Sequence, residues 1–124
     1  MKKILILMLS VVSFEVMAAK PTCHASSNGY CNYKGSVKQI YINSGNNILI
    51  YFDTPFDPSE ASVAGFSVTR GEAAILKITD QNRDFANLFY STALAAQASK
   101  REITILMKGT ESGYLKADRI WLAE

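Results

Sequence analysis

The sequence predicts a mainly β fold with a single helix. Several short stretches have strand-like apolar patterns, only residues 83–99 have helical spacing, and Gly, Asn, Asp and Pro separate these stretches. The predicted order is three strands, one helix and two strands. That order is typical of a small five-stranded OB-type barrel, which closes its own edges. An open antiparallel sheet with the helix packed on one face is the alternative.

The N-terminal residues 1–19 have the layout of a secretory signal peptide. Lys2 and Lys3 precede an apolar run, and Val16-Met17-Ala18 offers the small-x-small pattern that signal peptidase cuts. The run is shorter than the roughly 20 apolar residues that a transmembrane helix needs. No later stretch is long and apolar enough to span a membrane. We therefore expect a periplasmic or secreted product without a transmembrane segment.

The chain that remains after signal removal is nearly neutral. The whole sequence has 13 Lys and Arg residues against 11 Asp and Glu residues. Residues 1–19 contribute Lys2, Lys3 and Glu15, which leaves 11 basic against 10 acidic side chains. Such a balance gives no field that attracts a polyanion, so nucleic-acid binding is not expected. The remaining length is that of one small domain, which a covalent crosslink would help to stabilise.

Residues 20–34 are polar and rich in turn residues, and the stretch CHASSNGYC contains both cysteines. A Cys-x7-Cys pair in an exported protein is typical of a disulfide. The turn dipeptide Asn28-Gly29 can bring Cys23 and Cys31 together. The spacing is not that of a C-x-x-C redox pair. His24 is the only histidine, and with the two cysteines it supplies at most three ligands, so we expect no metal and no cofactor.

Residues 35–124 hold the predicted barrel. GSVKQIYIN at 35–43 alternates as a strand, and a turn at Ser44–Asn47 leads into NILIYFD at 47–53. This second strand is apolar on both faces, which is typical of a central strand or of one that meets a partner on its outside. Residues 53–64 contain two prolines and form a predicted loop.

The second half of the predicted barrel contains the helix. GFSVTRG at 65–71 and AAILKITD at 73–80 supply one bulged strand or two short ones. The predicted helix 83–99 follows, with Leu88 and Phe89 on its apolar face and no glycine after its end. EITILMKG at 102–109, the turn GTESG and ADRIWLAE at 117–124 complete the order.

No combination of residues indicates catalysis, and we predict a protein that is not an enzyme. There is no G-x-S-x-G nucleophile turn and no glycine pattern that cradles a phosphate. Asp53, Asp57 and Glu60 could pair as carboxylates. They lie in a polar loop, however, where acidic side chains are ordinarily solvated.

Tyrosines are the most informative side chains for binding. A tyrosine combines an apolar face with a polar tip, which suits carbohydrate stacking and protein interfaces. Tyr30 and Tyr33 flank the end of the predicted disulfide loop, and Tyr114 lies in the last predicted turn. We therefore take these three as candidate ligand contacts.

Two stretches carry a resemblance to a known family. GSVKQIYINSGNNILIYFDTP and FYSTALAAQASKREITILMKG, followed by a short last strand, resemble small exported bacterial proteins related to the binding subunit of subtilase cytotoxin and its pertussis-like relatives. The likeness covers residues 35–124. Where the family usually has Gly after Ser at the helix-to-strand junction, this chain has Lys100.

The resemblance implies an OB-fold subunit that forms rings of five, binds sialylated glycans and assembles with an enzymatic toxin subunit. The family's sugar-contacting serine has Ser26, Ser27 and Ser36 as possible counterparts, and we place Ser36 in the candidate site. The competing hypothesis is a stand-alone periplasmic or secreted protein of the same fold, with an interaction or structural role and no sugar site. Lysines on predicted strands favour a monomer, whereas Trp121 and the doubly apolar strand favour assembly.

Overall fold

The structure is a computed structural model that describes residues 18–123. Except for Ala18 and Ala19, the predicted signal peptide lies outside the described residues. The strands are β1 (Thr22–His24), β2 (Tyr30–Gly35), β3 (Gln39–Asn43), β4 (Asn47–Tyr51), β5 (Ala73–Lys77), β6 (Ile103–Glu111) and β7 (Tyr114–Leu122), and the helices are the 3-10 helix η1 (Pro58–Ala64) and the α-helix α1 (Arg83–Ser99).

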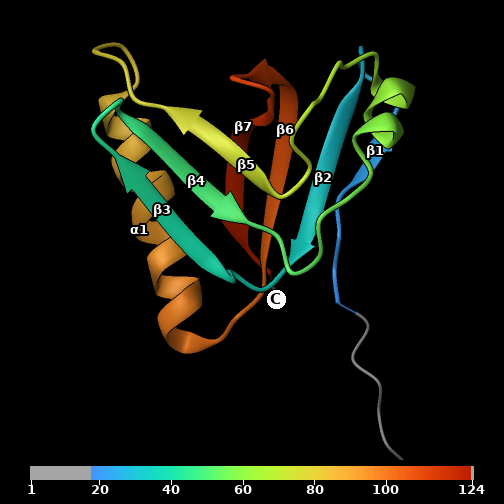
Figure 1. The fold of residues 1–124 in the computed structure, drawn as a ribbon. Coiled ribbons are helices and arrows are strands. Elements are labelled where there is room, and N and C mark those ends of the chain that lie inside the picture. Colours follow the sequence, from blue (N-terminus) through green and yellow to red (C-terminus); the bar gives the residue numbers. More distant parts are fainter. Residues whose placement is uncertain (1–17, 124) are drawn as a thin grey trace, which may run out of the picture.

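All described strands belong to one seven-stranded sheet with the order β1-β2-β6-β7-β5-β4-β3. The neighbours pair antiparallel except β5 and β7, which run parallel. Figure 1 shows the sheet bent into two arms, with β3, β4 and β5 in one arm and β2 and β6 in the other. Helix α1 lies against the core and contacts β7, while η1 lies beside β1.

The mainly β fold is confirmed, but the sheet is open and has seven strands where a closed five-stranded barrel was expected. The predicted strand 35–43 is divided: β2 ends at Gly35 beside β6, and β3 begins at Gln39 beside β4. Gly35 leaves no room for a side chain, because a Cβ there would lie 2.6 Å from the hydroxyl of Tyr33. The chain passes from one arm to the other at Ser36–Lys38. Within the predicted N-terminal segment 20–34, β1 and most of β2 are strands of the same sheet.

The predicted strand 65–71 is wrong. Its backbone groups pair with loops: Thr69 and Arg70 each donate an N–H to the carbonyl of Gly113 at 3.0 Å, and the carbonyl of Gly71 accepts from Phe56 at 3.0 Å. These bonds satisfy the segment without a neighbouring strand. The predicted loop 53–64 also contains more structure than expected, since it includes η1. Asp57 caps this helix by accepting the N–H of Ser59 at 2.9 Å.

The predicted helix 83–99 coincides with α1. It buries Ala86, Phe89, Ala93 and Ala96 against the core, whereas Leu88, expected on the apolar face, is exposed. No glycine ends the helix, as expected. Lys100 adopts the left-handed conformation with a φ of 56° and donates its N–H to the last turn.

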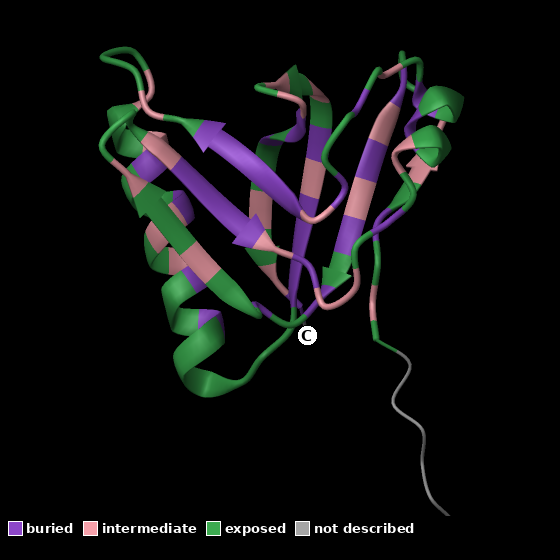
Figure 2. Ribbon diagram, viewed as in Figure 1, coloured by how far each residue is buried: buried purple, intermediate pink, exposed green. Residues whose placement is uncertain are grey.

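The core fills the space between the arms and α1, and β4 and β5 are buried on both faces (Figure 2). Ile48 and Ile50 face the main core with Phe89 and Ile105. Leu49 and Ile75 face the other way and form a second, smaller apolar cluster. That second cluster is the floor of the surface described next.

Candidate ligand-binding pocket

The CHASSNGYC stretch is a disulfide-closed hairpin. Cys23 and Cys31 face each other across β1 and β2 and form a disulfide, as predicted. Gly29 makes the turn with a φ of 87°. His24 stacks on Tyr30 with ring centres 4.8 Å apart, and its Nε2 lies 3.0 Å from Oδ1 of Asn32. Within residues 18–123 no three His, Cys, Asp or Glu side chains form a group that could hold a metal ion.

Tyr33 is fully buried and belongs to the core. Its hydroxyl donates to the carbonyl of Ser36 at 2.6 Å and accepts the N–H of Asp53 at 3.0 Å. Burial raises the pKa of Tyr33 far above its ordinary value. In this conformation Tyr33 offers no accessible surface to a ligand, and it joins the two arms of the sheet.

The four sequence-predicted contact residues do not form one site. Ser36 is exposed, and its hydroxyl donates to the carboxylate of Asp53. Tyr30 lies at the other end of β2, about 20 Å of extended chain away. Tyr114 is not in a turn: it is the first residue of β7 and lies opposite Glu111 of β6. It belongs to the second apolar cluster, which contains no residue of the disulfide hairpin.

A pocket lies on the face of β3, β4 and β5 that points away from the main core. Its volume is about 510 Å³. Its wall combines aromatic, apolar, amide and cationic side chains, contributed by Tyr41, Asn43, Asn47, Leu49, Tyr51, Arg70, Ile75, Ser112 and Tyr114. We refer to it as the tyrosine pocket.

Strand alternation places most of this wall. Tyr41 pairs with Leu49, and Asn43 pairs with Asn47, so all four side chains share one face of the β3–β4 hairpin. Tyr51 follows Leu49 by two residues and lies on the same face. Burial, with Tyr114 nearby as a weaker cause, raises the pKa of Tyr51. A tyrosine phenol is a neutral hydrogen-bonding group at neutral pH, and the raised pKa keeps it so at higher pH.

Arg70 closes one side of the pocket. Its Nη1 donates to the hydroxyl of Tyr114 at 3.2 Å, and its guanidinium carbon lies 5.5 Å from the centre of the same ring. The loop bonds to Gly113 hold Arg70 at this place. Among the described residues Arg70 forms no salt bridge with a carboxylate. A cation stacked on an aromatic ring is thus available to an anionic group.

One buried polar atom in the pocket wall is unsatisfied. Asn47 donates its amide nitrogen to Oδ1 of Asn43 at 3.3 Å, but its own Oδ1 is buried without a hydrogen-bond partner. An unpaired buried acceptor costs free energy and calls for an explanation. Asn47 is therefore an imperfectly satisfied point in the pocket wall.

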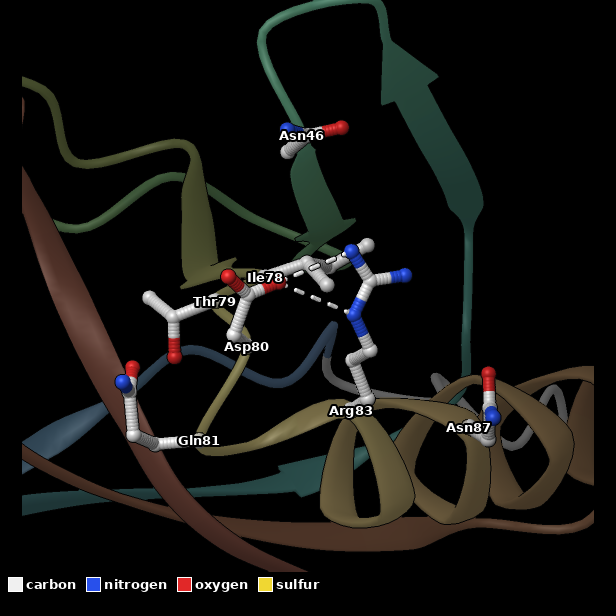
Figure 3. Close-up of a pocket in the computed structure, with 7 residues that line it drawn as sticks. All are labelled: Asn46, Ile78, Thr79, Asp80, Gln81, Arg83 and Asn87. Atoms are coloured by element: carbon white, nitrogen blue, oxygen red, sulfur yellow. Dashed lines mark hydrogen bonds and ion pairs between the residues drawn. The ribbon is translucent and has the colours of Figure 1, made fainter.

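A second pocket, of about 540 Å³, lies at the N-terminal end of α1 (Figure 3). Its lining is polar and comes from Asn46, Ile78, Thr79, Asp80, Gln81, Arg83 and Asn87. Figure 3 shows Asp80 and Arg83 pointing toward one another, and Nη2 of Arg83 lies 3.0 Å from Oδ1 of Asp80. Its opposite charges neutralise each other and no aromatic side chain lines it. The tyrosine pocket is therefore the better candidate for ligand binding.

Tyr114 is the only sequence-predicted contact that lines the tyrosine pocket. The sequence contained a signal for this face. Alternation places Leu49 and Tyr51 on one face of the second predicted strand, and pairing across the hairpin adds Tyr41 to it. No sequence signal places Arg70, because a loop brings it beside Tyr114 from 44 residues away.

Comparison of the chain with protein-family models, with curated proteins and with solved structures finds no match. In the part of the chain that the structure describes, no helix has the length and apolar character needed to cross a membrane.

Proposed function

We propose that this protein is an exported, non-enzymatic binding protein that takes a glycan into the tyrosine pocket. The observation that carries the proposal is the wall of the pocket itself. Tyr41, Tyr51 and Tyr114 surround one cavity with an unpaired guanidinium from Arg70. Tyrosine rings can pack against the apolar faces of sugars while their hydroxyls reach the polar edges. The disulfide between Cys23 and Cys31 supports export, because such bonds persist in oxidising compartments.

The charge of the pocket favours a glycan that carries an acid group. Arg70 has its guanidinium oriented by Tyr114 and can bind a carboxylate through two parallel N–H bonds. Sialic acid supplies such a carboxylate, together with hydroxyl and N-acetyl groups that can hydrogen-bond to the tyrosine hydroxyls of the pocket wall. This proposal agrees with the sialylated ligand that the resemblance to the toxin binding subunits implies.

The arrangement of the strands supports the OB-type part of the proposal. Helix α1 lies between β5 and β6 in the chain, and β5 pairs parallel with β7. Only residues 36–38 separate β2 from β3. We propose that β2 and β3 correspond to one bent first strand of an OB-type barrel, with β1 as an addition. An enzymatic toxin subunit as partner would follow from the same relationship.

The test is a calorimetric titration of the exported protein with sialyllactose and with lactose. We expect binding of sialyllactose only, because lactose lacks the carboxylate. Arg70→Gln should weaken binding about tenfold or more, which is about 1.4 kcal/mol. The matched control is Arg83→Gln, which removes a guanidinium from the other pocket and should leave the affinity unchanged. No binding of either sugar to the folded protein would refute the proposal.

A second candidate function is a stand-alone interaction or structural role without a sugar site. The exposed apolar side chains favour it, in particular Trp121 on β7, which is 45% exposed. In that case a Trp121→Ala variant loses a protein partner, and substitutions in the tyrosine pocket change nothing. Co-purification of the exported protein with its partner, followed by the same two variants, separates the two candidates.

A further inference from the structure

The strand β3 is one of the two edges of the sheet. It pairs with β4 on one side, and within residues 18–123 no strand lies on its other side. The opposite edge, β1, has only three residues, is fixed to β2 by the disulfide and has η1 next to it (Figure 1). An exposed edge presents unpaired N–H and C=O groups to another chain. Of the two edges, β3 is the one suited to pairing.

The sequence of β3 lacks the features that keep an edge strand apart from others. Its residues are QIYIN, with neither charge nor proline. Each face of the strand has one exposed large apolar side chain: Tyr41 is 43% exposed on one face, and Ile42 is 52% exposed on the other. The nearest charged residue in the sequence is Lys38, which immediately precedes the strand.

We propose that β3 pairs antiparallel with β3 of a second copy of this chain, with Tyr41 on the two-fold axis. The strand is self-complementary in this register. Ile40 faces Ile42 of the second copy, and Gln39 faces Asn43 of the second copy. Apolar side chains meet apolar ones and amides meet amides, which is the pairing that stabilises cross-strand neighbours. An interface of this kind is isologous and closes as a dimer, so it is an alternative to the ring of five that the resemblance implies.

The register also keeps like charges apart. Lys38 faces Ser44 of the second copy and not the second Lys38, so the positive charge that precedes the strand meets a hydroxyl. The main-chain hydrogen bonds of the added strand supply affinity, and the alternate side chains fix the register.

The dimer places two tyrosine pockets side by side. Directly opposed residues in an antiparallel pair point to the same face of a sheet. Tyr41 lines the pocket, so Tyr41 of each copy and both pockets lie on one continuous face. If the pockets bind glycans as proposed above, the dimer binds two ends of a branched glycan or two neighbouring glycans with increased avidity. The pairing of β3 itself does not depend on that function.

The first test is sedimentation velocity of the chain without its signal peptide over a concentration series. We expect a monomer–dimer equilibrium. Ile42→Lys places a charge opposite Ile40 of the second copy and should shift the protein to monomer. Val63→Lys is the matched control: it introduces the same charge at an apolar side chain that is 57% exposed on η1, and it should leave the dimer intact. Circular dichroism confirms that both variants are folded.

The second test reads the register directly and does not rely on destabilising the interface. Opposed Cα atoms in an antiparallel pair lie about 4.5–5.5 Å apart, within the range of a disulfide. Tyr41→Cys should therefore crosslink two chains on mild oxidation. Gln39→Cys lies on the same face but about 13 Å from its counterpart in the second copy, and should stay uncrosslinked.

Three outcomes would overturn the proposal: a wild-type monomer at every concentration, a ring of more than two chains, or a dimer that survives Ile42→Lys. Efficient crosslinking of Gln39→Cys with none of Tyr41→Cys would exclude the register. These measurements contain no sugar, so they fail or succeed independently of the calorimetric titration.

Discussion

The hydroxyl of Tyr33 accepts a hydrogen bond from the backbone N–H of Asp53 at 3.0 Å, and so ties β2 to the chain that leaves β4. The same hydroxyl donates to the carbonyl of Ser36 at 2.6 Å, at the point where the chain passes from β2 to β3. One buried phenol thus satisfies two backbone groups where the arms of the sheet meet.

Tyr33→Phe should lower the free energy of unfolding by about 1–3 kcal/mol, because the N–H of Asp53 and the carbonyl of Ser36, both in part-buried bonds, lose their partner. Urea denaturation followed by circular dichroism measures the change. Tyr41→Phe is the control, since the Tyr41 ring is 43% exposed and its loss of a hydroxyl should cost little. Equal stability of the two variants would show that the Tyr33 bonds are unimportant.

Stability should fall as the pH rises above about 10, the ordinary pKa of tyrosine. Burial raises the pKa of Tyr33 in the folded protein, so above that pH the unfolded chain loses a proton that the folded chain keeps. The folded state then binds more protons, and stability decreases with pH. Urea denaturation at a series of alkaline pH values, compared with Tyr33→Phe, tests this. An identical pH dependence in the variant would contradict it.

Gly29→Ala should destabilise the protein more than Gly65→Ala. Both glycines have a positive φ, 87° and 83°, so both substitutions pay the left-handed penalty of about 1–2 kcal/mol. A Cβ at Gly29 would also lie 2.0 Å from the carbonyl oxygen of Ala64, whereas at Gly65 nothing lies within 4 Å. The urea midpoints of the two variants are compared. Their difference measures the destabilisation that comes from the contact between the disulfide hairpin and η1. Equal midpoints for the two variants would mean that the hairpin can move away from η1 at no cost in stability.

Replacing both Cys23 and Cys31 by alanine should lower the free energy of unfolding by about 2.5 kcal/mol, the entropy gained by opening a nine-residue ring in the unfolded chain. A reducing agent should produce a similar loss in the wild-type protein and none in the double variant. If reduction leaves the thermal midpoint of the wild-type protein unchanged, the hairpin contributes nothing to stability.

Asn47→Ala should cost little stability, or even raise it, because the substitution removes a buried oxygen that has no partner. Asn43→Ala is the informative comparison. Oδ1 of Asn43 accepts the N–H of Gly45 at 2.9 Å in the β3–β4 turn, so its loss should cost about 1 kcal/mol. A large loss in Asn47→Ala would mean that its amide supports the fold and is not held ready for a ligand.

Patterns that repeat locally in the sequence predicted the elements well. Helix α1 coincides with the predicted range 83–99, and the β3–β4 hairpin has its turn where the Asn and Gly residues cluster. The disulfide followed from spacing and compartment. The division of 35–43 into two strands was not predictable from alternation, because the alternation continues through Ser36–Lys38, where the chain changes its partner strand from β6 to β4. The missing strand at 65–71 likewise depends on a distant carbonyl, that of Gly113.

The sequence alone determined the mainly β class, the helix, the disulfide and one residue of the pocket, Tyr114. The class, the helix and the disulfide follow from periodicity and spacing, which act over a few residues. Tyr114 followed from the chemistry of its side chain, although its place in β7 did not. The tertiary structure decided the rest. It buried Tyr33, whose sequence context resembles that of a surface aromatic, and it brought Arg70 to Tyr114 across 44 residues. It also left β3 at the edge of the sheet, with β4 on one side and no other described strand on the other. Burial, loop contacts and edge position depend on which distant segments meet, and no local pattern in the chain encodes that.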